Sequence, residues 1–363
     1  MPEILKIKEV DILTVKYNSK VIGRIALTPE GLAAFEYDKQ WLEKGFSVSP
    51  FFLPLQQGVF TAKQNPFEGN FGVFADSLPD GWGNLLLDRL LKKHQINPQS
   101  LNILQRLAIV GMNGMGALSY EPEFTIASSK ASSDLNAIFK EVEKILKEEE
   151  SLNDLEKLWL MAGSSAGARP KVMVKHNNEH WLVKFPSSSD PKNIGETEYQ
   201  YSLLAKKAGI DMPETKLFEG RFFGTKRFDI INNQRVHVHS AAGLLHANFR
   251  LPSLDYTELI KATRAITKDE NEVEKIFRLM VFNVLIGNKD DHAKNFSFIY
   301  SHNQWECSPA YDILPSKGLN DEHTTSVAGN GKPKKEDIFS IAQQTSISNK
   351  KAIEIYEEVS STV

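Results

Sequence analysis

The spacing of hydrophobic and polar positions changes along the first third of the chain. Residues 4–28 alternate apolar and polar side chains, and "YNSKVIGRI" predicts a hairpin that turns at Asn18 and Ser19. The stretch "YDKQWLEKGFSVSPFFLP" also favours strands and turns. From Leu78 onwards, "LPDGWGNLLLDRLLKKH" has apolar positions at helical spacing after a Pro-Asp-Gly entry, and "NPQSLNILQRLAIVG" predicts a second helix. "GMNGMGALSYEP" predicts a glycine-rich turn that leads into a strand.

The rest of the chain predicts further hairpins separated by helices. Residues 126–160 are serine-rich and then charged, which indicates a connection with one or two surface helices. "KVMVKHNNEHWLVKFP" predicts a hairpin, and "GETEYQYSLLAKKAGI" an amphipathic helix that ends at Gly209. "TKLFEGRFFGTKRFDII" predicts two strands, and residues 254–287 are mostly helical in pattern. "NFSFIYSHNQWECSPAYDIL" predicts a last hairpin, which is followed by Asp312.

The order of these elements predicts an α+β fold with four parts. We expect a small α+β domain over residues 1–125 and a connecting helical segment over 126–160. A strand-rich lobe over 161–235 and a mainly helical lobe over 236–363 should follow. The 363 residues are enough for two or three domains of ordinary size.

Composition narrows the functional classes. The formal net charge is -3, so no overall basic field favours nucleic acid. The single cysteine, Cys307, excludes an intrachain disulfide and a cysteine-built zinc site, and it fits a reducing compartment. The N-terminus lacks the apolar segment of a signal peptide, and the longest apolar run, around 276–287, is too short to span a bilayer. These features predict a cytoplasmic protein that does not bind membranes.

The stretch "LIGNKDDHAKNFSF", residues 285–298, sets two acids, a histidine, a lysine and an asparagine beside an apolar run. It completes an ordered series: a glycine-rich loop, a hairpin with a lysine, a helix with glutamates, strands, helices, an acid–asparagine loop, a hairpin and an acid. Protein kinases have this order. In such enzymes the loop covers phosphates, a strand lysine neutralises them, one acid accepts the hydroxyl proton, and an asparagine and a second acid hold magnesium.

Spacing selects one residue of the acid pair. The kinase catalytic loop is D-x-x-x-x-N, and counting back from Asn295 gives Asp290 and not Asp291. Asp312 follows one hairpin later, as the metal-binding acid does in kinases. An acid pair alone would more often be structural, for instance by pairing with neighbouring lysines. Because "H-R-D" and "D-F-G" are both missing, an ordinary eukaryotic protein kinase is excluded.

The motifs "GNKDDHAKNFSF", "SPAYDI", "GSSAGARPKV" and "WLVKFP" together resemble the HipA family of bacterial serine/threonine kinases, the toxin half of a type II toxin–antitoxin system. "LPDGWGNLLL" and "GMNGMGAL" resemble that family's N-terminal domain. The resemblance implies ATP and Mg²⁺ as cofactors, with Asp290 as catalytic acid, His292 and Lys184 at the phosphates, and Asn295 and Asp312 on magnesium. Other nucleotide-binding residues implied are Gly163, Ser164, Ser165, Ala166, Gly167, Lys171, Lys226, Arg227, Phe228 and Tyr311. The stretch "TKRFD" resembles the family's hinge, which implies that backbone groups of residues 226–228 contact adenine.

Several points remain open from the residues alone. Glu196 and Glu198 lie on one helix, and we select Glu198 as the partner of Lys184. The resemblance also implies that the kinase phosphorylates a serine of its own loop, Ser164 or Ser165, and thereby inactivates itself. The loop serines could instead simply suit a turn.

The resemblance implies partners as well. These are a HipB-like helix-turn-helix antitoxin, DNA contacted mainly through that antitoxin, and a protein substrate, with an aminoacyl-tRNA synthetase as one candidate. Two alternatives are a small-molecule kinase of the same fold and a non-catalytic pseudokinase that regulates a partner.

Overall fold

The computed structural model describes residues 7–125, 134–165 and 167–363. The chain divides into two compact units. The first contains residues 1–196 and 216–237, and the second contains residues 197–215 and 238–363. Each unit is described by itself below.

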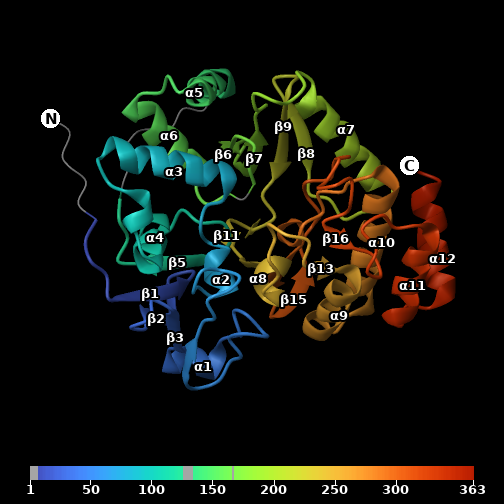
Figure 1. The fold of residues 1–363 in the computed structure, drawn as a ribbon, viewed down its shortest axis with the longest axis horizontal. Helices are drawn as coiled ribbons and strands as arrows, with labels where there is room; N and C mark the ends of the chain where they lie inside the picture. Colours follow the sequence, from blue (N-terminus) through green and yellow to red (C-terminus); the bar gives the residue numbers. More distant parts are fainter. Residues whose placement is uncertain (1–6, 126–133, 166) are drawn as a thin grey trace. The chain divides into compact units, whose positions relative to one another are not determined.

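A five-stranded sheet forms the N-terminal part of the first unit (Figure 1). Its strands run in the order β4-β3-β2-β1-β5 and comprise β1 (Ile12–Tyr17), β2 (Lys20–Leu27), β3 (Ala33–Tyr37), β4 (Val59–Thr61) and β5 (Leu118–Glu121). The predicted hairpin at Asn18 and Ser19 is confirmed, since both residues have positive φ. Side chains such as Leu13, Ile25 and Phe35 alternate into a hydrophobic core.

The stretch predicted as strands and turns after Tyr37 contains a helix instead. Helix α1 spans Lys39–Lys44, and Asp38 caps it by accepting a hydrogen bond from the Gln40 N–H. Six residues are too few to show helical periodicity clearly, so the cap was the usable signal.

The predicted helices after Leu78 are present. Asp80 caps α3, and the second helical stretch is divided in two by Asn102, which forms a capping box with Gln105. The elements here are α2 (Gly72–Ala75), α3 (Gly81–Lys93), the 3₁₀ turn η1 (Pro98–Ser100) and α4 (Ile103–Val110).

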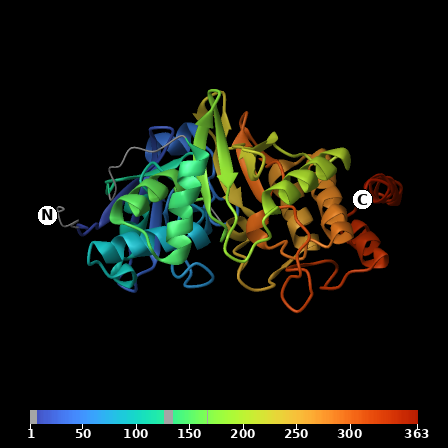
Figure 2. The ribbon, with the colours of Figure 1, turned by 90° about the horizontal axis from the view of Figure 1, so that it is seen from above.

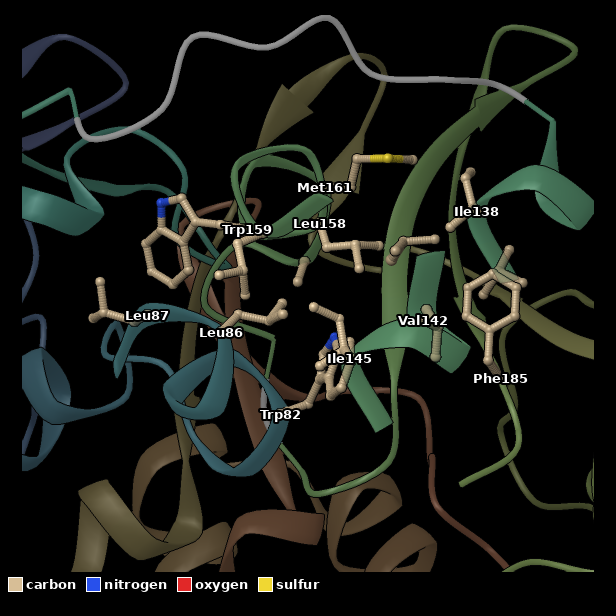
Figure 3. Close-up of a cluster of buried hydrophobic side chains, with 14 of the residues drawn as sticks. Trp82, Leu86, Leu87, Ile138, Val142, Ile145, Leu158, Trp159, Met161 and Phe185 are labelled. Carbon is tan, nitrogen blue, oxygen red and sulfur yellow. The ribbon is translucent and has the colours of Figure 1, made fainter. Parts of the chain in front are cut away.

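Helices α5 (Leu135–Lys147) and α6 (Leu152–Ala162) are core elements rather than surface helices as expected. Helix α6 packs on α3 and on strand β6, and α5 packs on α6. Figure 3 shows their side chains, including Ile138, Val142 and Leu158, meeting Trp82 and Leu86 of α3 in one cluster. Both helices carry charge on one face only, and the other face is buried.

A four-stranded sheet completes the first unit, in the order β6-β7-β9-β8. The predicted hairpin is confirmed, with Asn177 and Asn178 at positive φ in its turn. The strands are β6 (Lys171–His176), β7 (Glu179–Lys184), β8 (Thr215–Phe218) and β9 (Phe222–Lys226), followed by a small hairpin of β10 (Ile230–Ile231) and β11 (Gln234–Arg235).

The second unit is mainly helical (Figures 1 and 2). Helix α10 packs against both α9 and α12. The helices are α7 (Ile194–Lys207), which begins in the first unit, α8 (Ala241–Leu245), α9 (Tyr256–Thr267), α10 (Glu270–Ile286), η2 (Ala293–Asn295), α11 (Lys335–Gln344) and α12 (Asn349–Ser360).

Two small sheets accompany these helices. The predicted last hairpin is confirmed as β14 (Ser297–Ser301) and β15 (Gln304–Cys307), which join β12 (His237–Ser240) in the order β12-β14-β15. Strands β13 (Leu254–Asp255) and β16 (Thr325–Ser326) pair in parallel. Within the described part of the chain, no helix combines the length and the apolar character needed to cross a membrane.

Candidate functional site

The acid–asparagine loop begins where α10 ends. Gly287, at φ 70°, closes the helix by donating to the Asn283 and Val284 carbonyls. The chain then runs beside Ser316, whose hydroxyl accepts the Asp290 N–H at 2.7 Å. The Asp290 residue is exposed at this point. The loop therefore presents Asp290 on a backbone that is anchored from outside the loop.

Asn295 closes the loop back on itself. Its Nδ2 donates to the Asp290 carbonyl at 2.7 Å, and its backbone N–H donates to the His292 carbonyl at 2.8 Å. With Nδ2 engaged, the Oδ1 atom is the oxygen that the side chain can offer to a cation. An amide oxygen is a ligand that Mg²⁺ accepts, so this arrangement fits the predicted metal role.

The loop is also tied to the segment that carries Asp312. The Tyr311 hydroxyl donates to the Lys294 carbonyl at 2.7 Å and lies 2.5 Å from the Ser297 hydroxyl. This brings Asp312 and Asn295, the next residues along each segment, into one neighbourhood. Asp312 has φ 53°, a conformation that non-glycine residues rarely adopt and that clusters at functional sites. A carboxylate and an amide oxygen so placed are a suitable donor pair for Mg²⁺.

Asp291 is oriented quite differently from Asp290. It is fully buried, at 0% exposure. Its carboxylate accepts from the Tyr256 hydroxyl at 2.9 Å and from the Thr324 and Thr325 N–H groups at 3.0 and 3.2 Å, and it lies 3.0 Å from His323 Nδ1. Since buried carboxylates require such partners, Asp291 is a structural anchor. This division agrees with the assignment of the catalytic role to Asp290 by spacing.

A chain of buried polar groups extends from Asp291 to the backbone of Asp312. Asn283 Nδ2 donates to the Tyr256 hydroxyl at 3.1 Å, and Asn288 Nδ2 lies 3.1 Å from Asn283 Oδ1 and 3.4 Å from the Asp312 carbonyl. Burial and the nearby Asp291 charge raise the pKa of Tyr256 well above its usual value, so its hydroxyl stays a donor. No pattern in the sequence indicates this network, although Asn288 lies in the stretch 285–298 that also holds the acid pair.

His292, which belongs to the acid–asparagine loop, lies beside an aromatic side chain. Its ring centroid is 6.2 Å from that of Phe249, and the Lys294 ammonium lies 4.0 Å from the centre of the same Phe249 ring. Among the residues that the structure describes, the buried His292 Nδ1 has no hydrogen-bond partner. A polar atom in that state is suited to meeting a ligand, and the predicted phosphate role of His292 stays a prediction.

In the first unit, Lys171 and Lys184 are cross-strand neighbours at the base of the β6–β7 hairpin. Both side chains are buried, and the Lys184 ammonium lies 5.6 Å from the centre of the Phe223 ring. Like charges directly opposite in a sheet are destabilising, so two buried lysines in this position fit a polyphosphate ligand well. The roles of Lys171 and Lys184 at the nucleotide phosphates stay predictions.

The glycine-rich loop follows α6. Gly163 ends the helix at φ 53°, and the Ser164 hydroxyl, 3% exposed, accepts the Met115 N–H at 2.9 Å. Ser165 is 1% exposed, and its hydroxyl has no partner within the described chain. The carbonyl of Gly167 accepts the Trp82 N–H at 3.0 Å. Ala166, also predicted to contact nucleotide, lies outside the described residues.

The stretch predicted to contact adenine continues strand β9. The backbone N–H of Arg227 donates to the His180 carbonyl at 2.8 Å, so this N–H is already engaged. The Arg227 side chain forms two hydrogen bonds with the Asp229 carboxylate. The side chain of Lys226 pairs with Glu179. Phe228, the last residue of the stretch, is partly buried. Adenine recognition by the backbone of 226–228 remains a prediction, without the Arg227 N–H.

Burial separates the two candidate glutamates of α7. Glu198 is buried, whereas Glu196 is exposed. A buried carboxylate needs a partner more than an exposed one does, which favours Glu198 for the predicted role. Its pairing with Lys184 stays a prediction.

Comparisons with known proteins agree on one family. The family model described as the HipA-like C-terminal domain matches residues 163–363, and that described as the HipA N-terminal domain matches residues 13–121. The serine/threonine-protein kinase toxin HipA of Shewanella oneidensis is 24% identical over 324 residues, which cover 77% of this chain and 69% of that protein. Y4mE of Sinorhizobium fredii, named only provisionally as a kinase, is 25% identical over 350 residues, which cover 86% of this chain and 79% of that protein.

Other curated relatives are matched less completely. Y4dM of Sinorhizobium fredii is 26% identical over 204 residues, and the match spans 49% of each chain. A relative from Haemophilus influenzae is 26% identical over 178 residues, covering 42% of this chain and 52% of that protein. The chain therefore spans about half the length of each of these two relatives.

A solved structure shows the same fold. In the complex of HipA, HipB and operator DNA from Shewanella oneidensis MR-1, one chain matches with a TM-score of 0.72 at 17% identity, covering 96% of this chain and 88% of that chain. This likeness confirms the predicted α+β fold class with its N-terminal domain.

Proposed function

Because the chain belongs to the HipA family, we propose that it is a kinase that transfers the γ-phosphoryl group of Mg-ATP to a serine or threonine hydroxyl of a protein. The observation that carries this proposal is the different environment of the two adjacent acids. Asp290 is exposed on an anchored loop, while Asp291 is buried and bonded. An exposed, positioned carboxylate can accept a proton from a substrate, and a buried one with four neighbouring groups cannot.

The residues act by positioning and charge. In this proposal Lys171 and Lys184 neutralise phosphate oxygens, and Asp290 accepts the proton of the attacking hydroxyl. The hydroxyl oxygen bonds to the γ-phosphorus as the bond to the ADP oxygen breaks. Asn295 and Asp312 would hold magnesium, which would neutralise charge on the phosphates. Proton acceptance by a positioned side chain contributes typically about 10²–10⁴-fold to rate.

The test compares Asp312→Ala with the unaltered chain. We expect the variant to stay folded, to bind ATP no more tightly with Mg²⁺ than without it, and to lose phosphotransfer. Isothermal calorimetry and transfer of labelled phosphate to a protein lysate measure both. If the label enters only small molecules, the fold supports a small-molecule kinase instead. A folded Asp312→Ala protein with unchanged Mg-ATP affinity and rate would remove Asp312 from the site.

We propose further that the enzyme phosphorylates its own loop on Ser164 or Ser165. Both serines are buried, so a phosphate of about -1.5 to -2 charge could be added only if the loop leaves its present position. The added charge would then oppose binding of ATP phosphates. Mass spectrometry of the active protein should find phosphate on this loop, and the Asp290→Ala protein should have none. A loop that stays unmodified after long incubation with Mg-ATP would exclude self-inactivation.

A toxin role with an antitoxin partner is also proposed. The solved complex that shares this fold contains HipB and operator DNA, and the net charge of -3 here agrees with a partner that supplies most of the DNA contact. Co-expression with a small helix-turn-helix protein from the same locus should yield a complex that retards DNA strongly. Tight sequence-specific DNA binding by the chain alone would contradict this.

A further inference from the structure

The described residues of the glycine-rich loop, 163–165 and 167–168, are held in place by segments of the N-terminal domain. We define the support loop as residues 111–116, within "GMNGMG". Its Met115 N–H donates to the Ser164 hydroxyl at 2.9 Å. From the other segment, the Trp82 N–H at the start of α3 donates to the Gly167 carbonyl at 3.0 Å. All these residues lie in the first unit.

Two glycines allow the backbones to approach this closely. A Cβ on Gly163 would lie 2.5 Å from the Asn113 carbonyl oxygen. A Cβ on Gly83 of α3 would lie 2.8 Å from Pro79 Cβ and 3.2 Å from the Gly163 carbonyl oxygen. Gly83 costs helix stability relative to alanine by about 1 kcal/mol, so its use inside α3 indicates a requirement for close packing, most tightly against Pro79 and next against the Gly163 carbonyl.

A buried ionic network fixes the support loop in turn. Asp229, at 0% exposure, accepts the Gly116 N–H at 2.9 Å and is paired with Arg227 at 2.9 and 2.6 Å. Arg235 donates to the Met112 carbonyl at 2.6 Å and also to the Gly114 carbonyl. A fully buried carboxylate beside two half-buried arginines needs a reason, since burying charge costs desolvation. The reason offered by the geometry is a rigid support loop.

We propose that the N-terminal domain is a positioning element of the nucleotide site. Residues 81–83 and the support loop hold the glycine-rich loop, and Asp229 and Arg235 are positioning residues that act through the support loop. The expected effect on ATP binding rests on the proposed kinase function. The expected effect on the position of the glycine-rich loop does not.

Two variants test the positioning role, one by altering a side chain of the ionic network and one by altering a close backbone contact. Arg235→Lys keeps the charge but replaces a planar fork with a single ammonium that cannot serve both carbonyls equally. Gly83→Ala favours the helix yet crowds the Gly163 carbonyl. The matched control is Arg89→Lys, since Arg89 also donates to a carbonyl, that of Ile145, but contacts α5 rather than the loop. Thermal melting establishes that each variant folds.

Hydrogen exchange of the peptide with Ser164 and Ser165 is the readout that needs no activity. We expect faster exchange there in both variants and no change in Arg89→Lys. The KM for ATP should rise roughly tenfold with kcat nearly unchanged, because lost uniform binding raises KM alone. Unchanged exchange in the two variants, or faster exchange with an unaltered KM, overturns the inference. If the unaltered chain has no ATP turnover, the proposed function fails, and exchange measured with and without added ATP still decides the inference.

Discussion

The glycine-rich loop and the acid–asparagine loop are both short polar segments, but the protein holds them by different means. In the second unit, four groups surround the carboxylate of Asp291, and they come from α9 and from residues 323–325. In the first unit, Ser164 receives one neutral hydrogen bond, and the Ser165 hydroxyl is buried without a partner in the described chain. Hydrogen bonds to an ionised group are about twice as strong as neutral ones.

The difference indicates that the two loops have different mechanical tasks. A loop that is anchored by a buried charge keeps its neighbours Asp290 and Asn295 in one geometry, as their proposed roles in proton transfer and metal binding require. A loop that is held by close backbone packing and by neutral hydrogen bonds, such as those from the Met115 and Trp82 N–H groups, can be displaced at small cost. Such a loop suits a segment that covers a ligand and releases it.

The largest effect should come from the acid pair itself. Asp290→Asn retains shape but cannot accept a proton, so we expect the phosphotransfer rate to fall about 10²–10⁴-fold while the melting temperature stays the same. Single-turnover kinetics with labelled ATP measures this. A full rate in Asp290→Asn, together with loss of rate in a folded Asp291→Asn protein, would show that Asp291 is the catalytic acid.

Asp291→Asn should act on stability instead. The substituted amide turns one acceptor into a donor that faces the Tyr256 hydroxyl, His323 or the N–H groups of Thr324 and Thr325. Breaking a buried, charge-assisted cluster costs about 3–5 kcal/mol. Urea unfolding should find this loss, with Asp269→Asn, which alters the exposed acid that caps α10 in the same unit, as the comparison. A loss below about 1 kcal/mol, the usual worth of a cap, would contradict the anchoring role.

Paired serine variants should sharpen the contrast in the first unit. Ser164→Ala removes the acceptor for the Met115 N–H and should cost about 1 kcal/mol in the free energy of unfolding. Ser165→Ala removes a buried hydroxyl that has no partner among the described residues, and it should be neutral or slightly stabilising. Chemical denaturation of both proteins measures the difference. Equal losses for the two variants would mean that the Met115 contact contributes nothing specific.

The smallest predicted effect is a change in stability that appears only at acidic pH and depends on Asp229. Burial alone would raise the pKa of Asp229, but the hydrogen bonds and charge of Arg227, the Gly116 N–H and the charge of Arg235 lower it below its usual value. Stability from such a group is complete above the unfolded-state pKa of about 4 and is lost as pH falls through the folded-state pKa. The stability gap between the unaltered chain and Asp229→Asn should therefore be constant from pH 7 to 5 and narrow towards pH 3. A gap that stays constant down to pH 3 would refute the lowered pKa.

The local chemistry of the sequence determined the hairpins and the long helices. Three predicted hairpins turn on pairs of residues with positive φ, at 18–19, 177–178 and 302–303, and each pair acts within its own segment. Spacing to Asn295 likewise selects Asp290 for the catalytic role, because the catalytic loop of kinases is a contiguous motif, and that role stays a prediction. The helix Lys39–Lys44 was missed since six residues contain too little periodicity.

Only the tertiary structure decided what surrounds these motifs. Asp291 is a buried anchor because His323 and Thr324, more than thirty positions later, fold over it. Helices α5 and α6 are core elements because α3 and β6 cover their apolar faces. The support loop meets Ser164 across 49 positions of sequence. Burial and hydrogen-bond partners at such separations arise from packing of the whole unit, and no local pattern encodes them.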